Sequence, residues 1–289
     1  MEKFILYMKE QNISDNTCNS YANDIKLYKK YYKDSFGEDL TNLIHEDISM
    51  YRSYLLKHNI SAISINRKIS ALKMYNEFLV HEDLQEKVII IDKDYIKVQK
   101  SMIQKQLPSE RDINMLKHFS CRDKKNSKRD FCIIILLLYA GLRESELVNL
   151  RIVDIKLEER FLNIIGKGNK FRQVMINNLM YNALKDYLDE RQNMNIKNPY
   201  LIIGQKNKQT SKPLNRNFCN RLLNKYKEIC KINYLHPHLL RSYFCSNALH
   251  NAGYTIEQVA NQAGHSSLNT TKGYLISEQK DLLKLSNLL

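Results

Sequence analysis

The stretch FCIIILLLYAGLRESEL, residues 131–147, decides the fold of the region around it. Its apolar run, residues 131–140, is half of the roughly 20 residues that a helix needs to cross a bilayer, so it predicts a buried helix. Gly141 is placed to end this helix, because glycine readily adopts the left-handed conformation found at helix C-termini. Arg143 therefore lies just past a rigid, buried element.

The one clear strand pattern follows in RFLNIIGKGNKFRQVMIN, residues 160–177. Two apolar-rich runs flank GKGN, which predicts a β-hairpin with lysine at its tip. The flanking sequence is mainly helical, and Ser109 with Asp112 forms a capping-box pattern at the start of one helix. We predict a mainly α fold with a small β-sheet.

Residues 1–85 have helical periodicity throughout. Ser14 and Asp15 are capping candidates before an apolar face, and residues 61–80 form a second amphipathic helix. The predicted buried faces of the two helices consist of Tyr21, Ile25, Tyr28 and Tyr32, and of Ile65, Ile69, Leu72 and Leu79. The polar side of the second helix carries Arg67, Lys68 and Lys73, which fit either a DNA backbone or a solvated surface.

The chain divides into two parts of different charge. Residues 1–100 carry 15 basic and 15 acidic side chains, whereas residues 101–289 carry 30 and 16, so the second part holds the whole formal charge of +14. Residues 86–108 are charged, lack a sustained period and end in Pro108, which predicts a linker before a second domain over 109–289. The excess charge favours a nucleic-acid partner over a merely solubilising surface.

The six cysteines show no CxxC pair, and the histidines show no finger-like ligand spacing. We therefore expect free thiols in a reducing, cytoplasmic compartment and no metal site. The N-terminus interrupts its apolar residues with charges, so it does not have the pattern of a secretory signal.

Five short motifs that carry polar side chains follow one another along residues 141–274. They are GLRESEL with Arg143, GKGNK with Lys167, HPHLLRSYF with His238 and Arg241, AGH with His265, and KGY with Tyr274. This ordered set resembles the tyrosine recombinase (phage integrase) family, and the helices of residues 1–85 are similar to that family's core-binding domain. The resemblance implies a helical DNA-binding domain and a mixed α/β catalytic domain.

Cleavage of a phosphodiester through a covalent intermediate needs a nucleophile, cations on the phosphate oxygens and a proton for the leaving oxygen. The resemblance assigns Tyr274 as the nucleophile and Arg143 and Arg241 as the phosphate-binding cations. Glu146, three positions after Arg143, is expected on the same helical face, where the family likeness implies an orienting role.

The remaining polar residues supply proton transfer and DNA contacts. Lys167 at the hairpin tip is the predicted general acid, with Lys170 as its rival within the same turn. His238 is the predicted proton acceptor, selected over His236 by the H-x-x-R pattern, and His265 is a predicted hydrogen-bond donor to the phosphate. The predicted DNA contacts are Arg67, Lys68, Lys73, Lys170 and Arg172.

Two positions depart from the family pattern. Ser242 stands directly after Arg241, where the family often has histidine, and AGH stands where LGH is usual. Neither departure changes a catalytic group, but both alter the packing expected around the site.

The resemblance implies a site-specific recombinase that cleaves and rejoins DNA through a 3′-phosphotyrosyl bond, with neither ATP nor a metal ion required. It further implies a homotetramer on two double-stranded DNA sites, with residues 275–289 as an exchange segment between protomers; packing of this segment on its own domain is the alternative. An accessory or directionality protein is a further candidate partner. The short N-terminus favours a simple Xer-like or transposon-type enzyme without an arm-binding domain. A type IB topoisomerase and a non-catalytic basic DNA-binding protein are the alternatives.

Overall fold

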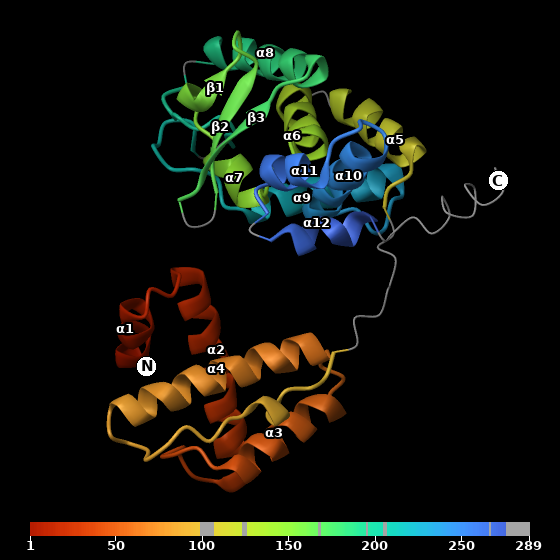
Figure 1. Ribbon diagram of the computed structural model, residues 1–289. Coiled ribbons are helices and arrows are strands. Elements are labelled where there is room, and N and C mark those ends of the chain that lie inside the picture. Colours follow the sequence, from red (N-terminus) through yellow and green to blue (C-terminus); the bar gives the residue numbers. More distant parts are fainter. Residues whose placement is uncertain are drawn as a thin grey trace, which may run out of the picture. The chain divides into compact units, whose positions relative to one another are not determined.

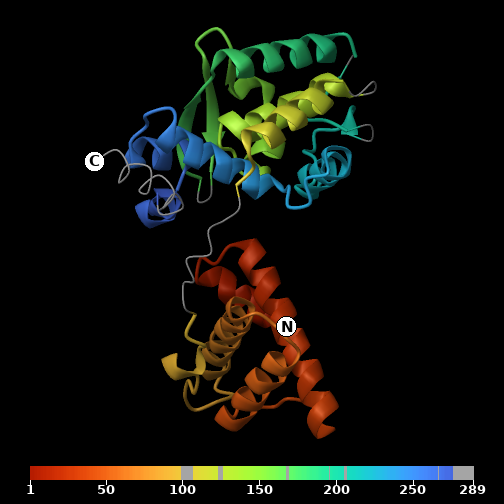
Figure 2. The ribbon, with the colours of Figure 1, turned by 90° about the vertical axis from the view of Figure 1, so that its right-hand side faces the viewer.

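The structure is a computed structural model that describes residues 1–98, 107–122, 126–166, 169–194, 196–204, 207–265 and 267–275. The chain divides into two compact units, Met1–Ile103 and Gln104–Leu289. Within these described ranges the first unit is helical, and the second combines helices with one three-stranded sheet (Figure 1, Figure 2). The predicted fold class, mainly α with a small β-sheet, is confirmed.

The first unit is built from helices that pack around a shared apolar core. These helices are α1 (Glu2–Glu10), α2 (Asp15–Phe36), α3 (His45–Lys57) and α4 (Ala62–His81). The Ser14 side chain caps α2 by accepting the Thr17 N–H, and Ser61 caps α4 in the same way. The predicted apolar faces of α2 and α4 are buried, except that Tyr21 is only half-buried.

The chain after α4 stays in contact with this unit through two asparagines of α4. The Asn76 side chain accepts the Ile89 N–H over 2.7 Å, and Asn66 both accepts from and donates to the backbone of Ile96 over 2.8 and 2.9 Å. A single 3₁₀ turn, η1 (Asp92–Asp94), lies between these contacts. Part of the segment 86–108 therefore packs as an extension of the helical unit, and residues 99–106 lie outside the described residues.

The second unit follows the order α5, α6, α7, η2, β1, β2, β3, α8, α9, α10, α11 and α12. Their bounds are α5 (Glu110–Cys121), α6 (Ser127–Tyr139), α7 (Glu144–Asn149), η2 (Ile152–Asp154), β1 (Ile155–Lys156), β2 (Phe161–Ile165), β3 (Phe171–Met175), α8 (Asn178–Gln192), α9 (Asn217–Cys230), α10 (Pro237–His250), α11 (Ile256–Ala263) and α12 (Leu268–Leu275).

The sheet of the second unit contains the predicted hairpin. Strands β2 and β3 pair antiparallel, with Leu162 opposite Val174 and Ile164 opposite Arg172. The short strand β1 adds to the outer edge of β2, so the sheet order is β1-β2-β3. At the start of α5, Ser109 and Asp112 form the predicted capping box.

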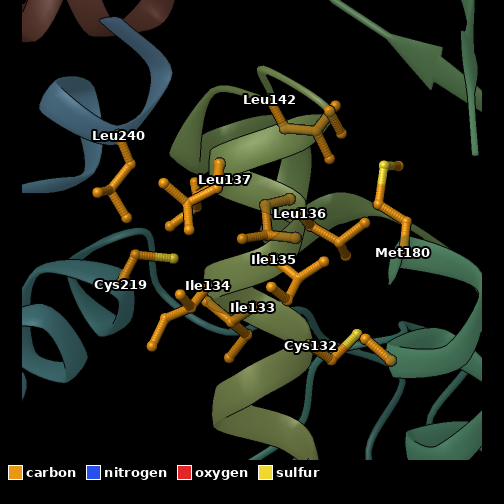
Figure 3. Close-up of a cluster of buried hydrophobic side chains, with 14 of the residues drawn as sticks. Cys132, Ile133, Ile134, Ile135, Leu136, Leu137, Leu142, Met180, Cys219 and Leu240 are labelled. Atoms are coloured by element: carbon orange, nitrogen blue, oxygen red, sulfur yellow. The ribbon is translucent and has the colours of Figure 1, made fainter. Parts of the chain in front are cut away.

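Helix α6 is the centre of the core of the second unit. Every side chain from Cys132 to Leu138 is at most 1% exposed. Figure 3 shows the surrounding side chains, among them Met180 of α8, Cys219 of α9 and Leu240 of α10. Burial of each such isoleucine or leucine contributes about 1.5–3 kcal/mol relative to an exposed side chain. Within the described parts of the chain, no helix is both long enough and apolar enough to span a membrane.

Gly141 ends α6 and lets α10 approach closely. Its φ is +61°, and a Cβ at this position would lie 2.4 Å from Cδ1 of the Phe244 ring. The Gly141 carbonyl also accepts a hydrogen bond from Arg241. The end of the buried helix is thereby fixed against the helix that carries Arg241.

We expect Gly141→Ala to lower the free energy of unfolding by about 2–4 kcal/mol, because left-handed backbone strain adds to a clash with the Phe244 ring. Gly253→Ala is the matched control, since Gly253 has φ +71° but nothing within 4 Å of its added Cβ. That variant should lose only about 1 kcal/mol. Urea unfolding measures both values, and equal losses would show that the ring contact is unimportant.

Candidate active site

Arg143 lies at the junction between the buried helix α6 and the short helix α7. Its backbone N–H donates to Oε2 of Glu146 over 2.8 Å, and its Nη1 donates to Oε1 of the same carboxylate over 2.8 Å. Glu146 thus lies on the face of Arg143, as the spacing of three predicts. The carboxylate completes a capping box and orients an arginine side chain that is 34% exposed.

A second guanidinium, from β3, binds the same carboxylate. Arg172 donates from Nη1 and Nη2 to the two oxygens of Glu146 over 3.0 and 2.8 Å, and from Nε to the Gln262 carbonyl over 2.9 Å. Burial raises the pKa of Glu146, but the hydrogen bonds from Arg172 and Arg143 outweigh it and hold that pKa below its ordinary value. An ionised Glu146 therefore joins α7 to β3, and Arg172 joins both to α11.

The contacts of Arg172 differ from the prediction that it binds DNA. Its side chain is only 12% exposed, and all three guanidinium nitrogens donate within the protein. The guanidinium also lies against Gly264, where an added Cβ would be 2.8 Å from Nη1. Gly264 has φ +66° and turns the chain from α11 toward His265. Arg172 therefore supports the active-site turn from inside the protein.

The second predicted arginine, Arg241 of α10, is buried more deeply, with 3% of its surface exposed. It donates to the carbonyl of Gly141 and, over 2.6 Å, to that of Ala263. Burial, followed by the charge of Arg143, lowers the pKa of Arg241 to about 10, so the group remains cationic at neutral pH. Arg143 reaches the same turn by donating to the Gly264 carbonyl over 2.6 Å. Two cations held this close favour a bound anion.

His265 and Tyr274 lie beyond this turn with their rings nearly parallel. The interplanar angle is 11° and the ring centroids are 6.3 Å apart. Nδ1 of His265 lies 2.8 Å from the hydroxyl of Thr271 on α12. Burial, then Arg241 and Arg143, lowers the pKa of His265 to about 4, so the imidazole is neutral at neutral pH. When Thr271 donates to Nδ1, the ring proton is on Nε2, where it is available to an anion.

Tyr274 is 5% exposed and packs against side chains of α10 and α11. Its hydroxyl lies 3.3 Å from Oγ of Ser242, and its backbone carbonyl lies 3.3 Å from Nε2 of His250. Burial raises the pKa of Tyr274, although the hydrogen bond with Ser242 opposes this effect. The phenol is therefore protonated at neutral pH, and it needs a proton acceptor to act as a nucleophile.

A cleft of about 440 Å³ opens beside the two arginines. Three predicted site residues line it, namely Arg143, His238 and Arg241. His238 is exposed on the first turn of α10, where the N-terminus of the helix adds partial positive charge. His236 instead caps this helix, because its Nδ1 accepts the Leu239 N–H over 3.2 Å. The cleft is thus lined by cations and a histidine.

The start of α9 forms another part of the cleft wall and was not among the predicted site residues. It contributes Arg216, Asn217 and Asn220. Asn220 donates to Glu144 over 2.8 Å, which connects α9 to α7. Burial raises the pKa of Glu144 against the opposing effects of Arg216 and Asn220. No motif marks these residues in the sequence, so only their position in the fold reveals them.

The predicted general acid, Lys167, lies outside the described residues. The hairpin that carries it is closed by a hydrogen bond of 2.8 Å from the Gly166 N–H to the Lys170 carbonyl. Lys170 itself is exposed. The side chain of Lys170 is thus accessible at the base of the turn.

Two of the three basic residues predicted on α4 pair with a buried carboxylate. Asp24 of α2, which is 4% exposed, pairs with Arg67 and, over 3.0 Å, with Lys68. Arg67 also donates to the Ser20 hydroxyl over 2.7 Å, and its side chain remains 45% exposed. Lys68 is 11% exposed, so its ammonium is held mainly inside the protein, whereas Lys73 is half-buried.

Comparisons with known proteins identify the class. The sequence profile of the Phage integrase family matches residues 107–280, and that of the Phage integrase, N-terminal SAM-like domain matches residues 1–83. The chain therefore belongs to the phage integrase family of tyrosine recombinases, enzymes that cleave and rejoin DNA strands. The resemblance expected from the five motifs is confirmed.

Particular relatives cover the full length. The chain is 36% identical to the TnP I resolvase of Bacillus thuringiensis over 292 residues, covering 100% of this chain and 99% of that protein. It is 28% identical to the tyrosine recombinase XerC of Staphylococcus epidermidis, covering 98% and 94% of the two chains.

Solved structures share the fold. XerH site-specific recombinase, in a post-cleavage complex with palindromic difH substrate, has a TM-score of 0.77 at 21% identity over 96% of this chain and 81% of that one. The Tn1549 transposon integrase, in complex with transposon right end DNA, has a TM-score of 0.70 at 17% identity over 99% and 98% of the two chains.

We expect Glu146→Gln to lower the free energy of unfolding at pH 7 by about 2 kcal/mol, because the guanidiniums of Arg143 and Arg172 lose the buried carboxylate that they share. The pKa of Glu146 is lowered in the folded protein, so this stabilisation is present above its ordinary value of 4.5 and is lost as pH falls through the folded pKa. The difference between wild type and variant should therefore shrink in acid. Urea unfolding at several pH values measures it.

Glu144→Gln is the matched control on the same helix. The pKa of Glu144 is raised in the folded protein, so loss of its charge should cost little at pH 7. A Glu146→Gln loss that does not change with pH would contradict the ionised state of Glu146.

Proposed function

We propose that Tyr274 is the nucleophile of a site-specific DNA recombination reaction in this protein. The observation that carries the proposal is the cleft in which Arg143, Arg241 and His238 meet, next to the paired rings of His265 and Tyr274. In this reaction the Tyr274 oxygen forms a bond to the scissile phosphorus, and the bond from phosphorus to the 5′ oxygen breaks. The products are a 3′-phosphotyrosyl bond and a free 5′ hydroxyl.

The two arginines stabilise the negative charge that develops on the phosphate during this step. Arg241 is fixed by carbonyls and is poorly hydrated, so its charge acts with little screening. Arg143 is more exposed and is oriented by Glu146, which suits a bidentate contact with non-bridging oxygens. His265, neutral at neutral pH, donates a hydrogen bond to the same phosphate.

Two further groups move the protons. His238 accepts the phenolic proton of Tyr274, since it is exposed in the cleft beside Arg143 and Arg241. Lys167, which lies between β2 and β3 in the sequence, donates a proton to the departing 5′ oxygen. The reverse reaction, in which a 5′ hydroxyl of the partner duplex attacks the phosphotyrosine, rejoins the strands without ATP.

The helical unit is proposed as the core-binding domain. Residues 1–85 would bind the DNA, residues 86–108 would connect the domains and residues 109–289 would form the catalytic domain. On α4, Arg67 is the best-placed DNA contact, because Asp24 and Ser20 orient a side chain that is still 45% exposed. Lys73 and, in the catalytic domain, Lys170 are further proposed DNA contacts.

The assembly is proposed to be a homotetramer on two double-stranded DNA sites, aided by an accessory or directionality protein. The exchange segment, residues 275–289, would dock on a neighbouring protomer, and its residues 276–289 lie outside the described residues. The 36% identity to a protein named resolvase supports resolution or transposon-type recombination as the biological role. Because the substrate is DNA, the proposal includes a cytoplasmic location.

The first test begins in cells, by sequencing the DNA ends attached to Tyr274. A nicked suicide substrate built from that site should then trap a covalent protein–DNA adduct with the purified protein. We expect Tyr274→Phe to abolish the adduct, because it removes the nucleophilic oxygen.

Tyr254→Phe is the control, since it removes the hydroxyl of an exposed tyrosine on the loop before α11. An undiminished adduct in Tyr274→Phe would overturn the assignment. Relaxation of supercoiled DNA without recombinant products would instead favour a topoisomerase.

We expect Lys167→Ala to slow adduct formation about 100-fold while site binding stays nearly unchanged, because the leaving oxygen loses its proton donor. A substrate with sulfur in place of the 5′ bridging oxygen should restore the rate, since a thiolate leaves without protonation. Lys170→Ala, measured in parallel, separates the two lysines. Equal loss of binding and cleavage in Lys167→Ala would make Lys167 a binding residue instead.

A further inference from the structure

Ser242 makes a contact with Tyr274 that the proposed reaction does not use. Ser242 follows Arg241 on α10 and is completely buried. Its hydroxyl lies 3.3 Å from the phenolic oxygen of Tyr274. A phosphate-binding residue and a residue in contact with the proposed nucleophile are therefore adjacent on one helix.

The resting position of Tyr274 is an apolar pocket rather than the cleft. Its side chain belongs to one cluster of buried side chains, together with Phe244, Cys245, Ala248, Val259 and Ala263. Among the described residues that line the cleft of Arg143, His238 and Arg241, Tyr274 is not included. The hydrogen bond with Ser242 is thus made inside this pocket, by a side chain that is 5% exposed.

A nucleophile must approach the phosphorus from within the cleft, because attack requires the two atoms to be about 3–3.5 Å apart and aligned. Tyr274 therefore has to leave its pocket before it reacts. Such a movement breaks the contact with Ser242, whereas Arg241, the preceding residue on α10, donates to the carbonyls of Gly141 and Ala263. The Ser242 hydroxyl consequently stabilises only the withdrawn position.

We propose that Ser242 is a positioning residue whose hydroxyl holds Tyr274 in this withdrawn position and so limits the fraction of protomers ready to cleave DNA. This inference rests on the proposed role of Tyr274 as the nucleophile. Loss of one neutral buried hydrogen bond shifts such an equilibrium by about three- to tenfold.

The kinetic test uses the full-length protein and the suicide substrate at saturating protein concentration. Ser242→Ala should form the covalent adduct about three- to tenfold faster than wild type, with unchanged affinity for the site. Ser242→Thr keeps the hydroxyl and should restore the wild-type rate. Ser246→Ala is the matched control, because Ser246 is a buried serine one turn further along α10.

A second measurement does not depend on catalysis. If the hydroxyls of Ser242 and Tyr274 form a hydrogen bond in solution, each single variant already removes that bond. The changes in melting temperature should then not be additive in the double variant. Ser242→Ala, Tyr274→Phe and the double variant should then melt at similar temperatures below wild type. Additive losses would show that the bond is absent.

The outcomes separate the two proposals. Slower cleavage by Ser242→Ala would overturn the inference and make Ser242 a residue that aligns Tyr274 for attack. Unchanged cleavage together with a lower melting temperature would leave Ser242 a purely structural role. Wild-type protein that forms no adduct on its own site would refute the role of Tyr274, while the melting temperatures would still decide whether the hydroxyls are bonded.

Discussion

The second unit depends on one carboxylate placed between two guanidiniums. Glu146, with 3% of its side chain exposed, accepts hydrogen bonds from Arg143 and from Arg172. Each arginine then extends the network, Arg143 to the Gly264 carbonyl and Arg172 to that of Gln262. A buried ion that loses its partner is strongly destabilising. Replacement of any one of these three side chains is therefore expected to destabilise the fold, because it leaves a charge without its partner. Helices α7 and α11 and the hairpin strand β3 are held in register by this group of charges.

The same network leaves excess positive charge beside the cleft. One carboxylate is shared by two arginines, and Arg241 donates to the carbonyls of Gly141 and Ala263, which carry no full charge. Burial and, next, the charges of Arg241 and Arg143 lower the pKa of His265, so the site disfavours a further cation. A dianionic or monoanionic phosphate group would offset this excess positive charge. A bound anion would therefore stabilise the arrangement of charges in this site.

Sequence patterns predicted the parts of the fold that depend on local periodicity or ordered motifs. The caps at Ser14 and Ser109, the buried faces of α2 and α4 and the hairpin follow from spacing along the chain. Contacts between distant polar groups were not predictable in this way. Arg172 is a basic residue beside the hairpin turn, which led to the prediction that it binds DNA. It contacts Glu146 only because the sheet packs against α7 in the folded protein. Asn76 has a polar side chain, yet it is completely buried because it binds the backbone of a segment beyond its own helix.

The buried ion pairs also change the meaning of the formal charge of +14. Several of the cations counted in it are neutralised inside the fold, including Lys68 by Asp24, Arg129 by Asp130 and Arg172 by Glu146. DNA binding releases counterions only where exposed cations replace them along the phosphate backbone. The ionic-strength dependence of binding is therefore governed by the accessible lysines and arginines, and it is weaker than the total number of basic residues implies.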